Sequence, residues 1–149
     1  MTAGKYCNRD VVITELDTTV TEAARLMRKH HVGDLVVTKK QGEENLPVGI
    51  VTDRDLVVEV LAQEVSLDSV TVKDVMSTDP VTVTEDETLL DTLELMKCRG
   101  VRRILVVGSQ GGLQGILSAD DAVELVTEAM NSLVKLTRRE ISHEKQQRP

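Results

Sequence analysis

Apolar residues recur at helical spacing in four stretches of the chain. In the first, Thr19 and Glu22 have the spacing of a capping box, and Ala23 and Met27 lie one turn apart behind them. This pattern predicts a helix over residues 19–31. The same periodicity predicts further helices at residues 53–63, around Leu89, Leu93 and Met96, and at residues 119–140, with a short helical turn at 72–76.

Short apolar runs between these helices predict strands. They lie at residues 11–14, 35–38, 48–51, 81–83, 104–107 and 113–117. The polar stretch 39–45 separates the second run from the third, so we expect a hairpin with a long, solvated connection. Gly108, Gly111 and Gly112 separate the last two runs and predict a turn.

The order strand, helix, strand, strand, helix occurs twice. Thr19 and Met27 match Thr88 and Met96 at a separation of 69 residues, and beyond the polar stretch matching positions are 66 residues apart. Such an internal repeat indicates two copies of one structural unit. We therefore predict an α/β (α+β) fold divided as follows: a first repeat at residues 4–66, a linker at 67–79, a second repeat at 80–128, and a helical extension with a basic tail at 129–149.

A hydroxyl and a carboxylate lie three residues apart at the same place in both repeats. Thr52 and Asp55 follow the strand sequence G-I-V, and Ser118 and Asp121 follow G-I-L. Two interpretations are open. Each pair can be a capping box that satisfies the first backbone N–H groups of a helix. Alternatively, the helix N-terminus and hydroxyl hold an anion while the carboxylate accepts hydrogen bonds from a sugar diol.

The last predicted helix is longer than one small domain needs. From Ala119 it keeps an apolar stripe through Ala122, Leu125, Val126, Ala129, Met130 and Leu133. We interpret the surplus as a surface for a second copy of the chain. The alternative is a solvated helical tail.

Composition disfavours nucleic acid as a partner. Tyr6 is the only aromatic residue among 149, so the chain lacks the stacking platforms that single-stranded nucleic acids use. The net charge is −7, whereas a duplex-binding domain presents a basic face. The tail from Lys135 to Pro149 carries five basic residues against two acids, so an acidic partner for the tail stays open.

Localisation signals are also missing from the pattern. No N-terminal stretch resembles a signal peptide, and no apolar run approaches the roughly 18 residues of a membrane span. Cys7 and Cys98 lie far apart and are expected to be free thiols. These features predict a cytoplasmic protein.

The duplicated corner resembles a known family. Two β-α-β-β-α copies, the strands V-G-D-L-V-V and V-R-R-I-L-V-V, and a G-h-h-[ST]-x-x-D corner in each copy are similar to a tandem pair of cystathionine-β-synthase (CBS) domains, or Bateman module. The chain looks most like the stand-alone two-repeat proteins of prokaryotes. The resemblance implies two repeats related by a pseudo-twofold axis, with two clefts for adenosine ligands such as AMP, ADP, ATP or S-adenosylmethionine.

The resemblance also implies residue roles. The carboxylates of Asp55 and Asp121 would bind ribose hydroxyls, and the hydroxyls of Thr52 and Ser118 would contact phosphate. The segment before the first strand of the opposite repeat would wall each cleft. This segment supplies Cys7 and Asn8 for the Asp121 cleft, and Ser77 and Thr78 for the Asp55 cleft.

A basic pair distinguishes the two repeats. Arg102 and Arg103 match a pair that often contacts ligand phosphates in the family, and the first repeat has Gly33 and Asp34 at these positions. Because arginine forms charge-assisted bonds with phosphate and a carboxylate repels it, we expect the Asp121 cleft to be the preferred site. A surface or dimer ion pair is the alternative for the two arginines.

Neither metal binding nor catalysis is expected. His30 and His31 diverge by about 100° on a helix, so they do not share a ligand set, and helix-end histidines are favoured by the dipole. No nucleophile or phosphate-loop motif occurs. Paired acids such as Asp120 and Asp121 could accompany Mg²⁺ on a nucleotide, but acids are favoured at helix starts anyway.

The sequence thus predicts a regulatory module. It would bind an adenine nucleotide between its repeats and transmit the bound state to an unidentified partner protein, as a homodimer without enzyme activity. The alternatives are a protein-interaction scaffold whose clefts are vestigial and, more remotely, a nucleic-acid-associated regulator that acts through the basic tail.

Overall fold

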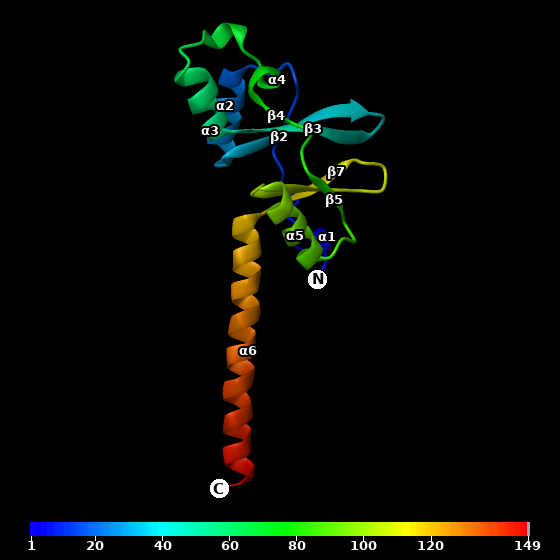
Figure 1. Cartoon of the computed structure of the whole chain (residues 1–149), viewed down its shortest axis with the longest axis vertical. Helices are drawn as coiled ribbons and strands as arrows, with labels where there is room; N and C mark the ends of the chain where they lie inside the picture. Colours follow the sequence, from blue (N-terminus) through cyan, green and yellow to red (C-terminus); the bar gives the residue numbers. More distant parts are fainter. Residues whose placement is uncertain (149) are drawn as a thin grey trace. The chain divides into compact units, whose positions relative to one another are not determined.

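The computed structural model describes residues 1–148 and divides them into two compact units, Met1–Leu117 and the segment that begins at Ser118 (Figure 1). The first part of the chain contains α1 (Ala3–Tyr6), β1 (Ile13–Thr14), α2 (Val20–His30), β2 (Asp34–Gln41), β3 (Glu44–Thr52), α3 (Asp53–Asp55), a π-helix η1 (Leu56–Leu61) and a 3₁₀ turn η2 (Leu67–Ser69). The remainder contains α4 (Val72–Val75), β4 (Ser77–Thr78), β5 (Thr82–Thr84), α5 (Leu89–Arg99), β6 (Arg103–Val107), β7 (Leu113–Ser118) and α6 (Ala119–Gln147). The mixed α+β fold with two small sheets and a long final helix confirms the predicted class.

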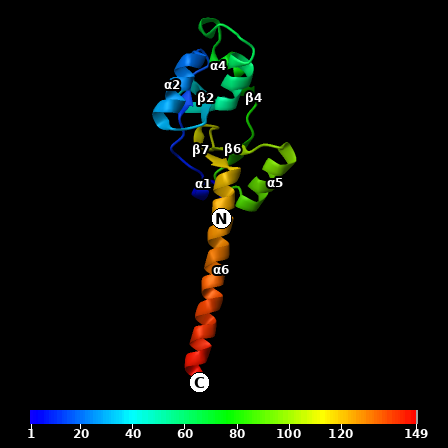
Figure 2. The same cartoon turned by 90° about the vertical axis from the view of Figure 1, so that its left-hand side faces the viewer.

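The first sheet has the strand order β1-β2-β3-β4. β1 runs parallel to β2, with Ile13 opposite Val36, and the other neighbours are antiparallel. Helices α2 and α4 pack on this sheet through a buried cluster (Figures 1 and 2). The members of the cluster are Ala23, Met27, Leu35, Val37, Val51 and Val72.

The β2–β3 hairpin differs from its prediction. The expected connection at residues 39–45 is mostly strand, because β2 continues to Gln41 and β3 begins at Glu44, with Gly42 at a φ of +63° in the turn between them. Residues 39–41 are exposed, so their side chains need not be apolar for the backbone to pair. The prediction of a long loop at residues 39–45 was wrong because it was based on polar composition alone.

The second sheet has the order β5-β6-β7 and carries the second repeat. β5 is parallel to β6, with Thr82 opposite Leu105, as β1 is to β2. Ile104, Leu105 and Val106 are fully buried. The second repeat therefore reproduces the local topology of the first.

The helix predicted at residues 53–63 is not a regular α-helix. It begins with one α-turn at Asp53–Asp55 and continues as a π-helix at Leu56–Leu61. Val57, Val58 and Val60 are β-branched, and such side chains crowd the preceding turn of an α-helix. The prediction of a single helix was correct in position but wrong in type.

The internal repeat also includes two short helices, α1 and α4, which precede the first strand of the sheet in each copy. α1 and α4 lie 69 residues apart, and each donates hydrogen bonds to the opposite repeat. The Gly4 N–H donates to the Glu85 carbonyl at 2.8 Å, and the equivalent Lys73 N–H donates to the Leu16 carbonyl at 3.2 Å. Two isolated β-bridges, Thr2–Thr88 and Thr19–Thr71, join the repeats in the same reciprocal way. This reciprocity is what a twofold relation between the repeats requires.

Helix α6 spans 29 residues from Ala119 to Gln147. It extends beyond the predicted end near residue 140, whereas Pro149, the last residue of the predicted basic tail, lies outside the described residues. None of the helices within residues 1–148 is both long and apolar enough to cross a membrane.

Close backbone approach makes two glycines necessary. An added Cβ at Gly49 would lie 2.5 Å from Met76 Sδ and 2.8 Å from the Ser77 carbonyl oxygen. At the equivalent Gly115, a Cβ would collide with Cys7 Sγ and would lie 2.9 Å from the Asn8 carbonyl oxygen. The segment that precedes each repeat therefore fits against the opposite repeat only because these positions lack a side chain.

This contact generates a stability prediction. We expect Gly49→Ala to lower the free energy of unfolding by about 1–3 kcal/mol, because the methyl group must displace a backbone carbonyl of β4. Gly108→Ala is the control, since the nearest atom to its Cβ is the flexible Gln114 Nε2 at 3.2 Å. Urea unfolding of both variants measures the effect, and equal stabilities would show that β4 does not depend on Gly49.

Candidate functional site

The first corner is a capping box. Thr52, at the end of β3, adopts an extended conformation and is the N-cap residue of α3. The Thr52 N–H donates to Asp55 Oδ2 at 2.8 Å, and the Asp55 N–H donates to Thr52 Oγ1 at 3.2 Å. Both residues are half-buried. The strand-to-helix corner thus fixes the orientation of the hydroxyl and of the carboxylate.

The second corner repeats this arrangement at the start of α6. The Ser118 N–H donates to Asp121 Oδ2 at 3.0 Å, and the Asp121 N–H donates to Ser118 Oγ at 3.1 Å. The Ser118 hydroxyl also donates to Asp121 Oδ2, at 2.7 Å. The two corners therefore share one hydrogen-bond pattern.

These bonds confirm the capping interpretation and leave the ligand interpretation compatible with it. In both corners the capping-box bonds use a single oxygen of the carboxylate, Oδ2. An ionised carboxylate has about four lone-pair positions on two oxygens, so it can cap a helix and still accept further hydrogen bonds. The capping box holds the carboxylate in place through Oδ2 and leaves Oδ1 outside the capping bonds.

A pocket of about 310 Å³ lies in the unit Met1–Leu117. Polar groups from both repeats line it: Thr52, Ser77, Thr78, Asp79, Arg102 and Arg103. Its apolar wall is formed by Ile50, Pro80, Val81 and Val101. The volume is at the lower end of the roughly 300–1,000 Å³ typical of small-molecule sites, and the mixture of an apolar wall with a few polar groups is also typical.

Ser77 and Thr78 line the pocket beside Thr52 of the first corner. Both residues form β4, which pairs with β3 through Ile50–Ser77 and Gly49–Thr78. β3 ends at Thr52, so the pairing places the β4 residues beside the corner. Asp55 is not one of the residues that line the pocket.

The basic pair lines the pocket of the first corner. Arg102 and Arg103 do so together with Thr52, Ser77 and Thr78, and their assignment from the sequence to the cleft of the second corner stays a prediction. Their place in this pocket has a topological reason, because Arg103 starts β6 in the second repeat and Asp34 starts β2 in the first. These equivalent strand starts face each other, so a basic residue of one repeat reaches the corner of the other.

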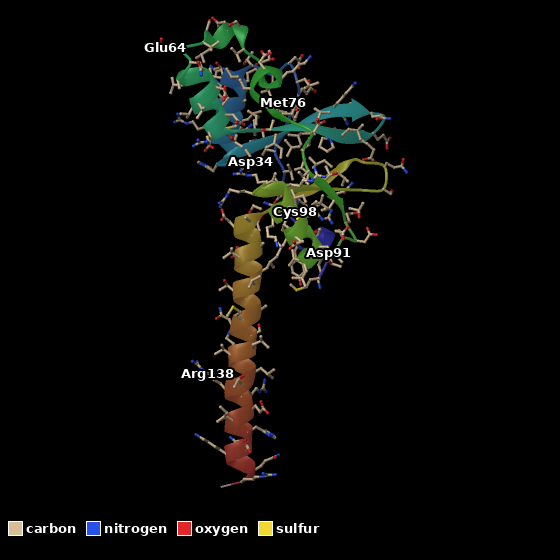
Figure 3. All side chains as sticks on the ribbon, viewed as in Figure 1. Asp34, Glu64, Met76, Asp91, Cys98 and Arg138 are labelled. Atoms are coloured by element: carbon tan, nitrogen blue, oxygen red, sulfur yellow. The ribbon has the colours of Figure 1, made fainter. Side chains whose placement is uncertain are left out.

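An ion pair joins these two strand starts. Arg103 Nε donates to Asp34 Oδ2 at 2.6 Å, and the side chains are 35% and 24% exposed (Asp34 is labelled in Figure 3). The two residues are 69 positions apart, so one position of the repeat pairs with its own counterpart. The sequence treated Asp34 as a group that repels phosphate, but the structure shows that Arg103 neutralises it.

Cys7 and Asn8 occupy the position that corresponds to Met76 and Ser77. The Asn8 N–H donates to the Ile116 carbonyl at 2.8 Å, and the Ile116 N–H donates to the Asn8 carbonyl at 2.9 Å. Ile116 precedes Ser118 by two residues in β7, just as Ile50 precedes Thr52 in β3. Burial, the largest cause, raises the pKa of the Cys7 thiol, so this thiol is neutral near pH 7.

Sequence reasoning missed two polar residues. One, Asp79, follows β4, and the other, Arg9, follows the Cys7–Asn8 segment. Asp79 lines the pocket and has a φ of +51°, which is uncommon outside glycine. Arg9 forms an ion pair with Glu85 at 2.8 Å and so ties the first segment to the second repeat. The signal that was available for Asp79 is its match to Asp10 at the 69-residue separation. Arg9 carries no comparable signal, because its counterpart is Thr78.

Metal binding was not expected from the sequence. Among residues 1–148, His, Cys, Asp and Glu side chains form no cluster of three that could hold an ion. His31, at the C-terminal end of α2, has a φ of +54° and lies in the last-turn environment that favours a histidine.

Comparison with known proteins identifies the fold family. The CBS domain family matches this chain twice, at residues 3–62 and 72–128. The uncharacterized protein MK0525 of Methanopyrus kandleri is 34% identical over 125 residues, which cover 84% of this chain and 62% of the relative. The chain spans 60% to 64% of the length of three such curated relatives.

Solved structures agree with this match. A conserved protein from Pyrococcus horikoshii has a TM-score of 0.72 at 26% identity, with 84% of this chain and 91% of that chain covered. The CBS domain pair of protein MJ0100, in complex with 5′-methylthioadenosine and S-adenosyl-L-methionine, also has a TM-score of 0.72, at 22% identity, with 85% and 99% covered. The second similarity is evidence of fold alone. The two matched segments, the exchanged short helices and the paired corners together show that this chain belongs to the CBS domain family and carries two CBS domains in tandem.

Proposed function

We propose that this CBS domain pair is a regulatory module that binds an adenosine ligand in the pocket of the first corner. The observation that carries the proposal is the composition of that pocket. It combines the hydroxyl of Thr52 from the first repeat with the hydroxyls of Ser77 and Thr78 and the two arginines of the second repeat, beside an apolar wall. Hydroxyls and guanidinium groups suit a phosphate or carboxylate, and the aliphatic wall suits a purine ring.

The ribose would be bound by the corner carboxylate. Asp55 is held beside Thr52 by the capping box, and its charge makes hydrogen bonds from sugar hydroxyls stronger than neutral ones. The sequence-based assignment of Ser118, Asp121, Cys7 and Asn8 to a second ligand position stays a prediction. Its support is the identical capping pattern at Ser118 and Asp121.

The charge balance of the pocket favours a ligand of low net charge. Arg102 and Arg103 line it together with Asp79, and Asp34 neutralises part of the charge of Arg103. A triphosphate would bring about four negative charges into this nearly neutral environment. Among AMP, ADP, ATP and S-adenosylmethionine, we therefore favour AMP or S-adenosylmethionine for this pocket.

Regulation would follow from the sharing of the pocket between repeats. Thr52 belongs to the first repeat and Arg103 to the second, so a ligand that contacts both stabilises one relative packing of the repeats. A partner protein that prefers this packing then binds more tightly, and by linkage it raises the affinity for the ligand by the same factor. The proposal assigns no catalytic step, and it places the protein in the cytoplasm as a homodimer.

A scaffold with vestigial ligand positions is the second candidate. The observation that favours it is that both corner carboxylates already serve as helix caps and that Asp55 does not line the pocket. In that case the tandem domains would serve only to bind a partner protein or a second copy.

Ligand binding separates the two candidates. We expect AMP or S-adenosylmethionine to raise the melting temperature of the wild-type chain, because a ligand specific for the folded state stabilises it. In calorimetry, Asp55→Asn should weaken binding about 10- to 150-fold through loss of a charged hydrogen bond. The asparagine oxygen can still accept from the Thr52 N–H, so the helix cap is retained.

Asp74→Asn is the matched control for this variant. Asp74 caps α4 through a 2.9 Å bond from the Thr71 N–H in the same capping geometry, but its capping partner Thr71 does not line the pocket, whereas Thr52, the partner of Asp55, does. We expect its ligand affinity to equal that of the wild type. Unchanged affinity in Asp55→Asn would remove the ribose assignment, and the absence of a thermal shift with every adenosine ligand would favour the scaffold.

The Asp34–Arg103 pair generates a further prediction about phosphate. We expect Asp34→Asn to strengthen AMP binding about 2- to 5-fold, because the guanidinium no longer shares its charge with a carboxylate. The free energy of unfolding should fall by no more than about 1 kcal/mol, the usual limit for a partly exposed pair. Calorimetry and urea unfolding measure the two effects.

Glu94→Gln is the control, since it removes the exposed Lys97–Glu94 pair of 2.8 Å on α5 without touching the pocket. Weaker AMP binding in Asp34→Asn would contradict this account. It would mean that Asp34 positions Arg103 for the phosphate rather than competing with it.

A further inference from the structure

A polar pocket lies at the outer end of the first sheet. β1 ends at Thr14, whereas β2 continues to Gln41, and the pocket is formed by residues 13–17 and by the outer part of the β2–β3 hairpin. This hairpin pocket has a volume of about 400 Å³ and shares no lining residue with the pocket of the first corner. Its volume lies within the range typical of small-molecule sites.

Charged side chains of both signs line the hairpin pocket. Glu15 and Asp17 come from the segment that follows β1, and Lys39 and Lys40 come from β2. All four residues are exposed, and within residues 1–148 none of them forms an ion pair. Equal numbers of acids and bases give the lining no net charge, so it suits a small ligand that carries one charge of each sign.

Two buried threonines add hydroxyl groups to this lining. Thr14 and Thr38 are only 5% and 6% exposed. Within residues 1–148, Thr14 Oγ1 is the only buried side-chain nitrogen or oxygen atom that has no hydrogen-bond partner. A buried hydroxyl without a partner lowers the stability of the folded state. A ligand that supplies the missing hydrogen bond would account for this hydroxyl.

The second repeat shows that the fold does not require these threonines. At the separation of 69 residues, Thr14 and Thr38 correspond to Val83 and Val107. Val83 lies in β5, which pairs with β6 in the same parallel register as β1 with β2, and it is also buried. Valine therefore fills the equivalent position of the same fold without a polar group, and packing does not explain the threonine.

The two lysines likewise have no counterpart in the second repeat. Lys39 and Lys40 correspond to Gly108 and Ser109, which follow β6. The repeated fold thus forms without basic residues at this place. The unpaired lysines and the buried hydroxyls are additions of the first repeat, and they occur together in one pocket.

We propose that the hairpin pocket binds a free α-amino acid, as a second ligand of the chain. The two lysines would bind the carboxylate of the amino acid, and the two acids would bind its ammonium group, through charge-assisted hydrogen bonds. Ile13 and Leu16 supply the apolar part of the lining, so an aliphatic side chain suits it best.

Calorimetry of the full chain with the proteinogenic amino acids tests the ligand class. We expect saturable binding of at least one aliphatic amino acid. The N-acetyl and carboxamide derivatives of that amino acid should each bind at least about 10-fold more weakly, because each derivative lacks one of the two charges. The absence of binding by every amino acid, or equal affinity for both derivatives and the parent, would overturn the proposal.

Charge variants test which side chains bind which group. Lys39→Met with Lys40→Met should weaken binding at least about 10-fold and abolish the preference over the carboxamide. Glu15→Gln with Asp17→Asn should abolish the preference over the N-acetyl derivative in the same way. The matched control is Lys135→Met with Lys145→Met on α6, which should keep the wild-type affinity. Pocket variants that retain both preferences would contradict the assignment.

Thr14→Val tests the buried hydroxyl. The variant should raise the melting temperature of the free chain, because it removes the unpartnered hydroxyl, and should weaken amino-acid binding about 2- to 10-fold. A lower melting temperature with unchanged affinity would show that the hydroxyl serves the fold and would overturn its role in the pocket. Asp55→Asn should leave amino-acid binding unchanged, so these outcomes are independent of the nucleotide proposal.

Discussion

The structure depends on the reciprocal attachment of two short segments to the opposite repeats. α1 and the Cys7–Asn8 segment pair with the second repeat, and α4 with β4 pairs with the first. Each attachment consists of backbone hydrogen bonds at a point where Gly49 or Gly115 leaves room for the crossing chain. Because both segments cross between repeats, neither CBS domain completes its own sheet edge. The tandem pair is therefore the smallest unit that satisfies these backbone groups.

The same crossing builds the pocket. β4 is held against β3 beside Thr52, and the strand starts at Asp34 and Arg103 face each other. In this way the polar groups of the pocket come from segments up to about 50 residues apart in sequence, and both repeats contribute. A ligand there would contact both repeats, which is the physical basis of the regulation proposed above.

Much of the fold could be predicted from the sequence, because it rests on local signals. The helix caps at Thr19, Thr52 and Ser118 were visible as hydroxyl-carboxyl spacings, and all three are confirmed as capping boxes. The length of the β2–β3 hairpin was underestimated because backbone pairing there does not require apolar side chains. The π-helical turn at Leu56–Leu61 leaves an apolar stripe like that of an α-helix, so the hydrophobic pattern alone could not reveal it.

The candidate site was predicted less completely, for a reason of topology. Five of the predicted residues, Thr52, Ser77, Thr78, Arg102 and Arg103, line one pocket. Their grouping in one pocket could not be read from the sequence, because a repeat alignment tells which positions are equivalent but not which repeat each side chain faces. The pairing of Asp34 with Arg103, two equivalent positions, could not be foreseen from either repeat alone.

The central claim is that one ligand contacts both repeats at once, and an NMR titration tests it most directly. With isotope-labelled protein and AMP or S-adenosylmethionine, the account predicts saturable shifts of the Thr52, Ser77 and Thr78 amides together with the Arg102 and Arg103 amides. Shifts confined to one repeat, or no shifts at these five positions while the ligand binds elsewhere, would contradict it.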